Sequence, residues 1–226
     1  MHRAEALPDR PTLVVDLDGS LVRTDTLRQL LRVALRDRPS RLLRALGALR
    51  HGRARFKQAV ADIVELDPAA LPYNADVIAY LRDERKTGRR VILATAADRR
   101  VAVAVATHLG LFDAVLASDG VTNLKGSAKL AAIRETVGGQ AFVYIGNERA
   151  DLAVWRGAAA AILVGAGASL TRAAAAVAPI ERAFPGRSTA LPSPLRADLW
   201  VRRLRSSRRP GKHTISAPPP PDDRRC

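Results

Sequence analysis

The sequence predicts an α/β fold, in which a parallel sheet carries helices on both faces in three α/β/α layers. Short, continuously apolar runs alternate with helical segments from residue 89 onward, which is the pattern of a parallel sheet. A first apolar run at residues 12–17 stands apart from the others, because residues 21–88 show only helical periodicity. We therefore expect a small helical cap inserted after the first strand.

The first apolar run is predicted to be a buried strand because it does not alternate with polar residues. On such a strand the side chains of Asp16 and Asp18 share a face. Neighbouring carboxylates raise each other's pKa, so the pair favours a bound cation or two different chemical roles. Gly19 allows the backbone to turn directly afterwards. This stretch alone is equally typical of a strand that ends in an ordinary Asp-Gly turn.

The inserted region predicts four helices. Leucines recur at spacings of three and four along residues 27–35, with arginines on the opposite side. Thr24 to Thr26 supply N-cap residues, and Pro39 separates this helix from the next. The other three helices are expected over about 42–49, 55–65 and 75–87.

The rest of the core follows as strand and helix in turn. Strands are predicted at 91–94, 113–117, 142–145 and 160–164, and helices at 98–109, 127–137 and 150–157. Ligands bind at the carboxyl ends of the strands in an open parallel sheet. The polar residues predicted at that edge are Asp16, Asp18, Thr95, Lys125, Asn147 and Asp151.

These elements predict four segments in the chain. The α/β core comprises residues 12–20 and 89–184, and the helical cap comprises residues 21–88. Residues 1–11 and the basic, Pro-rich tail, 185–226, are expected to be mostly disordered. Within the tail, residues 195–205 have the pattern of a short basic amphipathic helix.

The net charge of +15 is concentrated in two places. Residues 21–65 hold 11 Lys/Arg against 4 Asp/Glu, and residues 182–226 hold 11 against 3. Basic cap helices are consistent with a solvated face, with attraction of an anionic substrate, or with contact with an anionic membrane surface. Nucleic acid is disfavoured, because no aromatic residues interleave the basic cluster of the tail for base stacking.

Cysteine usage and the terminal sequence point to a cytoplasmic location. Cys226 is the one cysteine, so neither a disulfide framework nor a cysteine metal site is expected. The first 11 residues lack the apolar core of a signal peptide. The apolar run at residues 158–170 is too short to span a bilayer.

The residues at the sheet edge carry a coherent chemistry. Two carboxylates, a hydroxyl, an ammonium group and a further carboxylate are the parts needed for metal-assisted phosphoryl transfer through an aspartyl-phosphate. Chance convergence of five such residues on strand ends is a poor alternative. A dinucleotide-binding interpretation of Gly165 to Gly167 fails, because the third glycine is missing and the segment follows the last predicted strand.

The chain resembles the haloacid dehalogenase superfamily of hydrolases in its phosphatase branch. The motifs that carry the resemblance span residues 12–165 and are Asp16–Ser20 (DLDGS), Thr95, Lys125 and Gly146–Asp151 (GNERAD). The resemblance implies a Rossmann-like core and a Mg²⁺-dependent phosphatase. Its substrate would be a small phosphorylated metabolite or a prenyl or lipid phosphate.

The resemblance also implies a role for each motif residue. Asp16 would attack phosphorus, and Asp18 would act as general acid and base. Thr95 and backbone amides near Gly19 would bind phosphoryl oxygens. Lys125 would neutralise the charge on Asp16, with Lys129, one helical turn on, as the alternative.

The metal ligands would be Asp16, the backbone carbonyl of Asp18, Asn147 and Asp151. These oxygen atoms suit Mg²⁺. The fourth motif departs from the family, which usually has Asp after the glycine where this chain has Asn147. An amide oxygen ligates Mg²⁺ without contributing charge.

Four stretches further resemble the soluble domain fused ahead of UbiA-type prenyltransferases: LPYNADVIAYL, ATAADRR, LASDGVTNLKGSAK and GNERADLAVWR. This resemblance implies a stand-alone or truncated form of that domain, peripheral to the inner face of the membrane. It also opens an alternative function, that of a catalytically weak or inactive accessory to a prenyltransferase partner.

Overall fold

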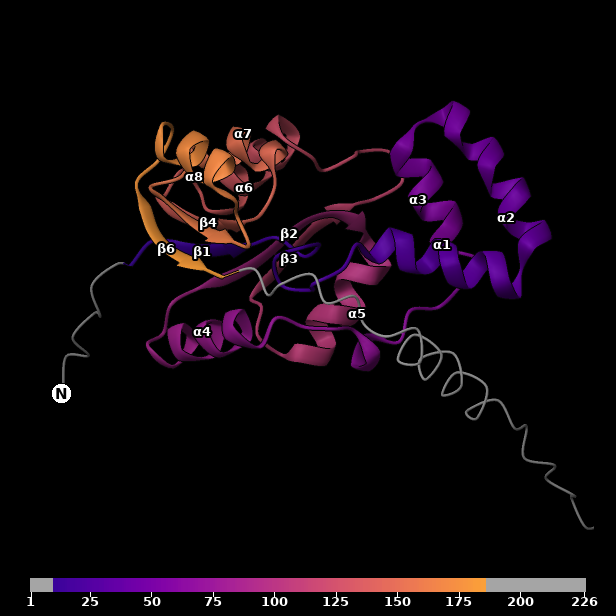
Figure 1. Cartoon of the computed structure of the whole chain (residues 1–226), viewed down its shortest axis with the longest axis horizontal. Coiled ribbons are helices and arrows are strands. Elements are labelled where there is room, and N and C mark those ends of the chain that lie inside the picture. Colours follow the sequence, from indigo (N-terminus) through magenta and orange to yellow (C-terminus); the bar gives the residue numbers. More distant parts are fainter. Residues whose placement is uncertain (1–9, 186–226) are drawn as a thin grey trace, which may run out of the picture. The chain divides into compact units, whose positions relative to one another are not determined.

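The computed structural model describes residues 10–185, and its centre is a six-stranded parallel sheet (Figure 1). The strand order is β3-β2-β1-β4-β5-β6, and every neighbouring pair is parallel. The strands are β1 (Thr12–Val15), β2 (Val91–Asp98), β3 (Ala114–Ser118), β4 (Phe142–Gly146), β5 (Ala160–Val164) and β6 (Ile180–Phe184). Because β1 is central, the residues that follow it lie in the middle of the sheet edge.

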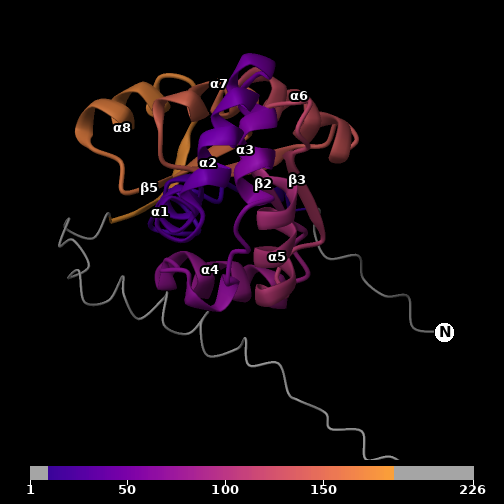
Figure 2. The same cartoon turned by 90° about the vertical axis from the view of Figure 1, so that its right-hand side faces the viewer.

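Helices cover both faces of this sheet. Seen from two directions, α6 (Ser127–Thr136), α7 (Leu152–Trp155) and α8 (Ala168–Ala175) lie on one face, and α4 (Ala75–Lys86) and α5 (Arg99–Leu109) lie on the other (Figures 1 and 2). A single 3₁₀ turn, η3 (Arg149–Asp151), precedes α7. The predicted three-layer α/β/α class is therefore confirmed.

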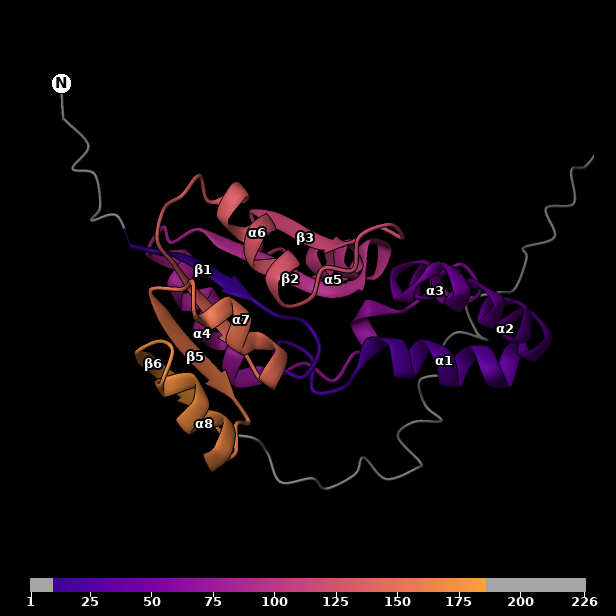
Figure 3. The same cartoon turned by 90° about the horizontal axis from the view of Figure 1, so that it is seen from above.

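Three helices project beyond one end of the sheet, and we call them the cap helices (Figure 3). They are α1 (Thr26–Asp37), α2 (Pro39–Leu46) and α3 (Arg53–Ala61), with the 3₁₀ segment η1 (Gly47–His51) between the last two. A second 3₁₀ turn, η2 (Pro68–Ala70), leads to α4. The proposed domain boundaries remain a prediction, and α4 lies under the sheet whereas α1 to α3 do not (Figure 1).

Local sequence explains where the cap helices begin. The side chain of Asp25 accepts a hydrogen bond from the backbone N–H of Arg28 at 3.0 Å, which caps α1. Pro39 occupies the first turn of α2, where its missing N–H costs no hydrogen bond. Gly52, with φ of 100°, lets the chain reverse into α3.

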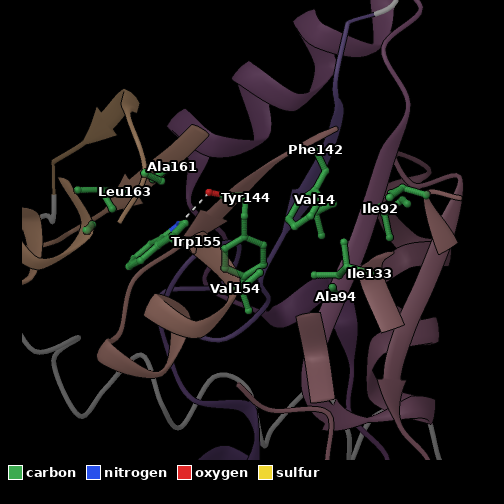
Figure 4. Close-up of a cluster of buried hydrophobic side chains, with 13 residues drawn as sticks. Val14, Ile92, Ala94, Ile133, Phe142, Tyr144, Val154, Trp155, Ala161 and Leu163 are labelled. Atoms are coloured by element: carbon green, nitrogen blue, oxygen red, sulfur yellow. Dashed lines mark hydrogen bonds between the residues drawn. The ribbon is translucent and has the colours of Figure 1, made fainter. Parts of the chain in front are cut away.

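The core cluster beneath α6 and α7 fixes the strand that carries the fourth motif (Figure 4). Trp155 and Tyr144 are fully buried and meet edge to face, with ring centroids 6.3 Å apart. Trp155 Nε1 donates a hydrogen bond to the Tyr144 carbonyl at 3.1 Å, as Figure 4 shows. This contact ties α7 back to β4 across the motif loop.

Two parts of the fold differ from the sequence prediction. The first strand ends at Val15, not at residue 17, so Asp16 and Asp18 do not share a strand face. The final pair, α8 and β6, was not predicted. The sequence of β6 has two adjacent charged residues at its centre and half of the residues of α8 are alanine, so neither shows a clear apolar period. The predicted helix at 195–205 lies outside the described residues.

Candidate active site

The chain turns sharply after β1, and this turn positions both aspartates. The backbone N–H of Asp16 donates to the Ile145 carbonyl at 3.0 Å, which keeps Asp16 in line with the sheet. Leu21 N–H and Val22 N–H then close the turn on the carbonyls of Asp16 and Leu17. Asp18 points away from the sheet, and its Oδ1 accepts the Thr26 N–H of α1 at 2.8 Å.

The side chain of Asn147 leaves no room for a Cβ at position 19, so a glycine is needed there. The φ of Gly19 is 78°, and a Cβ at this position would lie 2.1 Å from Nδ2 of Asn147. Ser20 donates from Oγ to Asn147 Oδ1 at 3.2 Å, so the amide is held against the turn. The Gly19 N–H itself donates to the Val22 carbonyl at 2.7 Å. The turn already engages this amide, and its use for a phosphoryl oxygen stays a prediction.

A cavity of about 210 Å³ opens at this edge of the sheet, between the core and the cap helices. Five of the predicted residues line it, whereas Gly19 and Asn147 are not among its lining residues. The five are Asp16, Asp18, Thr95, Lys125 and Asp151. The cap side of the cavity is lined by Asp25, Thr26, Leu27, Leu30, Arg53 and Lys57.

Lys129 is the cation that contacts Asp16. Its Nζ lies 2.8 Å from Asp16 Oδ1 and donates to the Tyr144 hydroxyl at 2.9 Å. The Tyr144 hydroxyl in turn donates to Asp151 Oδ1 at 2.9 Å. All four side chains are buried, so their charges interact more strongly than they would in water. We call these four residues the buried network.

The sequence prediction had assigned this contact to Lys125, and the structure corrects it. Lys125 lies in the loop before α6, its side chain is 44% exposed, and its Nζ pairs with Glu148 at 2.9 Å. Helix α6 begins at Ser127 and buries Ile133, which turns the side chain of Lys129 inward. The alternative named from the sequence, Lys129, is thus the one that the geometry supports.

Two further residues of the site were missed from the sequence. Tyr144 lies two residues before Gly146, so strand alternation gives both residues the same side of β4 and could have signalled its place. Lys57 donates from Nζ to the Ala96 carbonyl and, at 3.0 Å, to Asn123 Oδ1. The position of Lys57 depends on how α3 packs on the core, and the local sequence does not predict that packing.

Thr95 is fully buried near the carboxyl end of β2. Its Oγ1 accepts a hydrogen bond from the Ala97 N–H at 3.0 Å, and this contact does not use the hydroxyl hydrogen. That arrangement leaves the hydroxyl able to donate to an oxygen in the cavity.

Burial dominates the acid–base properties of the two aspartates. It raises the pKa of Asp16 to about 7, with Lys129 opposing the shift and Asp151 and Asp18 adding to it. It raises the pKa of Asp18 to about 6, against the stabilising hydrogen bond from Thr26 N–H. Burial also lowers the pKa of Lys57. Both carboxyl groups can therefore carry a proton close to neutral pH.

Asp151 organises the motif loop with both of its oxygens. Oδ1 accepts the Tyr144 hydroxyl, and Oδ2 accepts the backbone N–H groups of Asn147 and Glu148 at 2.9 and 3.0 Å. The Cβ of a side chain at position 146 would lie 2.7 Å from Asp151 Oδ2, so Gly146 permits this approach. In this structure the Asp151 carboxylate therefore stabilises the conformation of the motif loop.

The donor chemistry near Asp16 suits a hard cation. Within residues 10–185, no three His, Cys, Asp or Glu side chains form a ready metal-binding group. The oxygen donors at the turn are the Asp16 carboxylate, the Asp18 backbone carbonyl and the Asn147 amide, a set that Mg²⁺ accepts together with water. The residues present therefore fit Mg²⁺ with few charged ligands.

Part of the chain is similar to a known family of hydrolases. Residues 47–156 match the family described as haloacid dehalogenase-like hydrolase. This match spans just under half of the chain. It supports the hydrolase class predicted from the motifs.

An uncharacterized protein of Sinorhizobium fredii is 39% identical to this chain over 155 residues. The match covers 69% of this chain but only 30% of the relative, which is much longer. No described helix, that is none between residues 10 and 185, is long and apolar enough to cross a bilayer.

Several solved structures share the fold at low identity. A Bordetella pertussis protein of unknown function aligns with a TM-score of 0.58 at 16% identity, covering 76% of this chain and 98% of that one. Apo phosphoserine phosphatase aligns at 0.54 and 15%, covering 79% and 96%. A phosphatase of the same superfamily from Thermococcus onnurineus aligns at 0.54 and 16%, covering 78% and 94%. These likenesses support the fold.

Proposed function

We propose that this hydrolase is a phosphatase that cleaves phosphate monoesters through an aspartyl-phosphate on Asp16. The observation that carries the proposal is the ion pair of Asp16 with buried Lys129 at 2.8 Å, on a cavity that Asp18 and Thr95 also line. Lys129 holds Oδ1 of Asp16, which leaves Oδ2 as the attacking atom. A small phosphorylated metabolite or a prenyl or lipid phosphate is the proposed substrate.

The reaction divides into two displacements at phosphorus. In the first, Asp16 Oδ2 forms a bond to phosphorus, the bond to the ester oxygen breaks, and Asp18 gives its proton to that oxygen. In the second, Asp18 takes a proton from water, whose oxygen attacks phosphorus and breaks the bond to Asp16. The products are an alcohol and inorganic phosphate, and both aspartates return to their starting states.

The remaining residues neutralise and position the phosphoryl group. Lys129 offsets the negative charge that accumulates near Asp16, and the Thr95 hydroxyl donates to a phosphoryl oxygen. When bound, Mg²⁺ supplies further positive charge to the phosphoryl oxygens. Asp16, the Asp18 carbonyl and Asn147 would hold it, and Asp151 would orient Asn147 through the loop backbone.

Hydrolysis of p-nitrophenyl phosphate by the full chain tests this function. We expect turnover that requires Mg²⁺, is lost with a chelator and is abolished in Asp16→Asn. The matched control is Asp76→Asn, which removes an exposed carboxylate on α4 and should leave turnover unchanged. A broad phosphate panel that yields no turnover with any substrate would overturn the proposal.

A second candidate function follows from the fourth motif. Asn147 brings no charge, and Asp151 has both oxygens engaged by protein donors, so metal affinity is lowered relative to a two-carboxylate motif. The domain would then act as a weak or inactive accessory at the cytoplasmic face of the membrane, beside a prenyltransferase. Asn147→Asp separates the two candidates. A large gain in Mg²⁺-dependent turnover would favour this second function.

A further inference from the structure

The outer part of the cap exposes large apolar side chains. Among the described residues, six large hydrophobic side chains are classed as exposed, and four of them lie between positions 35 and 49. Their exposed fractions are 64% for Leu35, 69% for Leu43, 44% for Leu46 and 49% for Leu49. Single exposed leucines are ordinary, but four within so short a stretch mark an interaction surface.

These leucines are additional to the packing of the cap. Leu30 and Ala34 of α1 and Leu42 and Ala45 of α2 are already buried, so each helix has an inner apolar face of its own. Leu43 and Leu46 are three residues apart on α2 and therefore share a second, outer face. Folding of the cap gains nothing from their exposure, so a partner must explain it.

Arginines are interspersed with the exposed leucines along the sequence. Exposed arginines in and beside this stretch include Arg32, Arg38, Arg41, Arg44 and Arg50. Asp37 is the one acidic residue between positions 26 and 61. We call the four leucines and these five arginines the leucine–arginine face. Such a surface is complementary to a partner that has an apolar interior and negatively charged groups on its surface.

The leucine–arginine face lies away from the catalytic edge. In two views α2 is at the far end of the cap helices, remote from the sheet (Figures 1 and 3). Helix α1 joins the two sites, because Leu27 and Leu30 line the cavity while Leu35 is near its other end. At 1.5 Å per residue, Leu30 and Leu35 are separated by about 8 Å along the helix axis.

We propose that the leucine–arginine face binds the surface of an anionic lipid bilayer. Leucines enter the boundary between headgroups and acyl chains, while the arginine stems lie along them and the guanidinium groups meet lipid phosphates. Each arginine near an anionic surface adds to the attraction. Leucines suit acyl chains, whereas a nucleic-acid surface would call for aromatic side chains that stack on bases.

One consequence rests on the proposed phosphatase function. A chain docked by this face brings the cavity close to the headgroup layer, so a phosphate ester carried in the bilayer becomes the favoured substrate class. Docking itself does not depend on catalysis, and a binding assay therefore tests it separately.

The test is co-sedimentation of the full chain with vesicles. We expect binding to vesicles of phosphatidylcholine with about 30% phosphatidylglycerol, little binding to phosphatidylcholine alone, and weaker binding at high salt. The double variant Leu43→Gln, Leu46→Gln should lower the partition coefficient about tenfold or more. The matched control is Val103→Gln, Val121→Gln, which alters two exposed valines outside the cap and should change nothing.

A second pair of variants tests the charges. Arg41→Gln, Arg44→Gln should weaken binding to anionic vesicles, whereas Arg156→Gln, Arg172→Gln, at exposed positions of the core, should not. Circular dichroism of each variant checks that the helices are retained.

Three results would overturn the proposal. The first is the absence of binding to anionic vesicles at low salt. The second is binding that the leucine variant leaves unchanged, which would assign it to other basic residues of the chain. The third is a dimer in sedimentation velocity that the leucine variant dissolves while vesicle binding persists, which would assign the face to a second copy. If docking holds but p-nitrophenyl phosphate is not hydrolysed, only the phosphatase function fails.

Discussion

Asp16 and Asp18 are two residues apart, but the structure places them in different surroundings. Asp16 belongs to the buried network, where it pairs with Lys129 of α6, which also donates to the Tyr144 hydroxyl of β4. Asp18 faces the cap, where the first backbone N–H of α1 binds it. The core side of the site therefore pairs its carboxylate with a full positive charge, and the cap side pairs its carboxylate with a peptide N–H.

The difference shows how one turn separates two chemical roles. Both carboxylates have a raised pKa because both are buried, but only Asp16 has a full positive charge in contact. Asp18 has a peptide N–H, which stabilises a carboxylate less than an ammonium group does. Loss of each partner should therefore have different consequences for stability and for turnover.

The largest expected effect is that of Lys129→Met. This change leaves Asp16 and Asp151 buried without their cation, so we expect a loss of about 3–5 kcal/mol in the free energy of unfolding and no measurable turnover. Urea denaturation and the phosphatase assay measure the two effects. Lys125→Met is the matched control, with at most about 1 kcal/mol lost, because its ion pair is exposed. Equal effects for the two lysines would contradict the assignment of Lys129.

The next effect is that of Asp18→Asn on turnover. An amide can neither give nor take the proton, so we expect a loss of about 10²–10⁴-fold in kcat, with the fold retained. Single-turnover measurement should show that both formation and breakdown of the aspartyl-phosphate are slowed. A variant that keeps its full kcat would remove Asp18 from the mechanism.

The pH dependence of stability compares the wild-type chain with Asp18→Asn without any measurement of catalysis. The folded-state pKa of Asp18, about 6, lies above the ordinary aspartate value of 3.8, so the folded state binds the proton more tightly. Its contribution to stability is complete below about pH 4 and is lost as the pH rises through about 6. In metal-free buffer, the wild-type chain should therefore lose stability relative to Asp18→Asn over this range. A difference that stays constant with pH would show that Asp18 has an ordinary pKa.

The smallest effect concerns the turn that separates the aspartates. Gly19→Ala adds a Cβ against Asn147 to the strain of a positive φ, whereas Gly110→Ala, with φ of 62°, meets nothing within 4 Å. The second change should cost about 1 kcal/mol, and the first about 1–3 kcal/mol more, with a fall in turnover as the Asn147 amide is displaced. Thermal unfolding of the two variants measures the difference. Equal losses would mean that Asn147 moves aside without cost.

Much of this molecule could be predicted from local patterns. Continuous apolar runs such as Val91 to Ala94 are sufficient to identify buried strands, and glycines such as Gly110 mark helix ends. The order of these elements predicts a parallel sheet. In such a sheet the carboxyl ends of the strands meet at one edge, which brings Asp16, Asp18 and Thr95 together. Strands of mixed composition, such as β6, cannot be predicted in this way, because their burial depends on a neighbouring strand.

The tertiary structure alone decided how the polar groups are paired. Sequence offers Lys125 and Lys129 at the same edge, but the packing of α6 turns only Lys129 toward Asp16. Spacing cannot show that Asp151 accepts three hydrogen bonds, or that the amide of Gly19 is used by the turn. The physical reason is that a buried polar group must find a partner within about 3 Å, and that partner is supplied by segments distant in sequence.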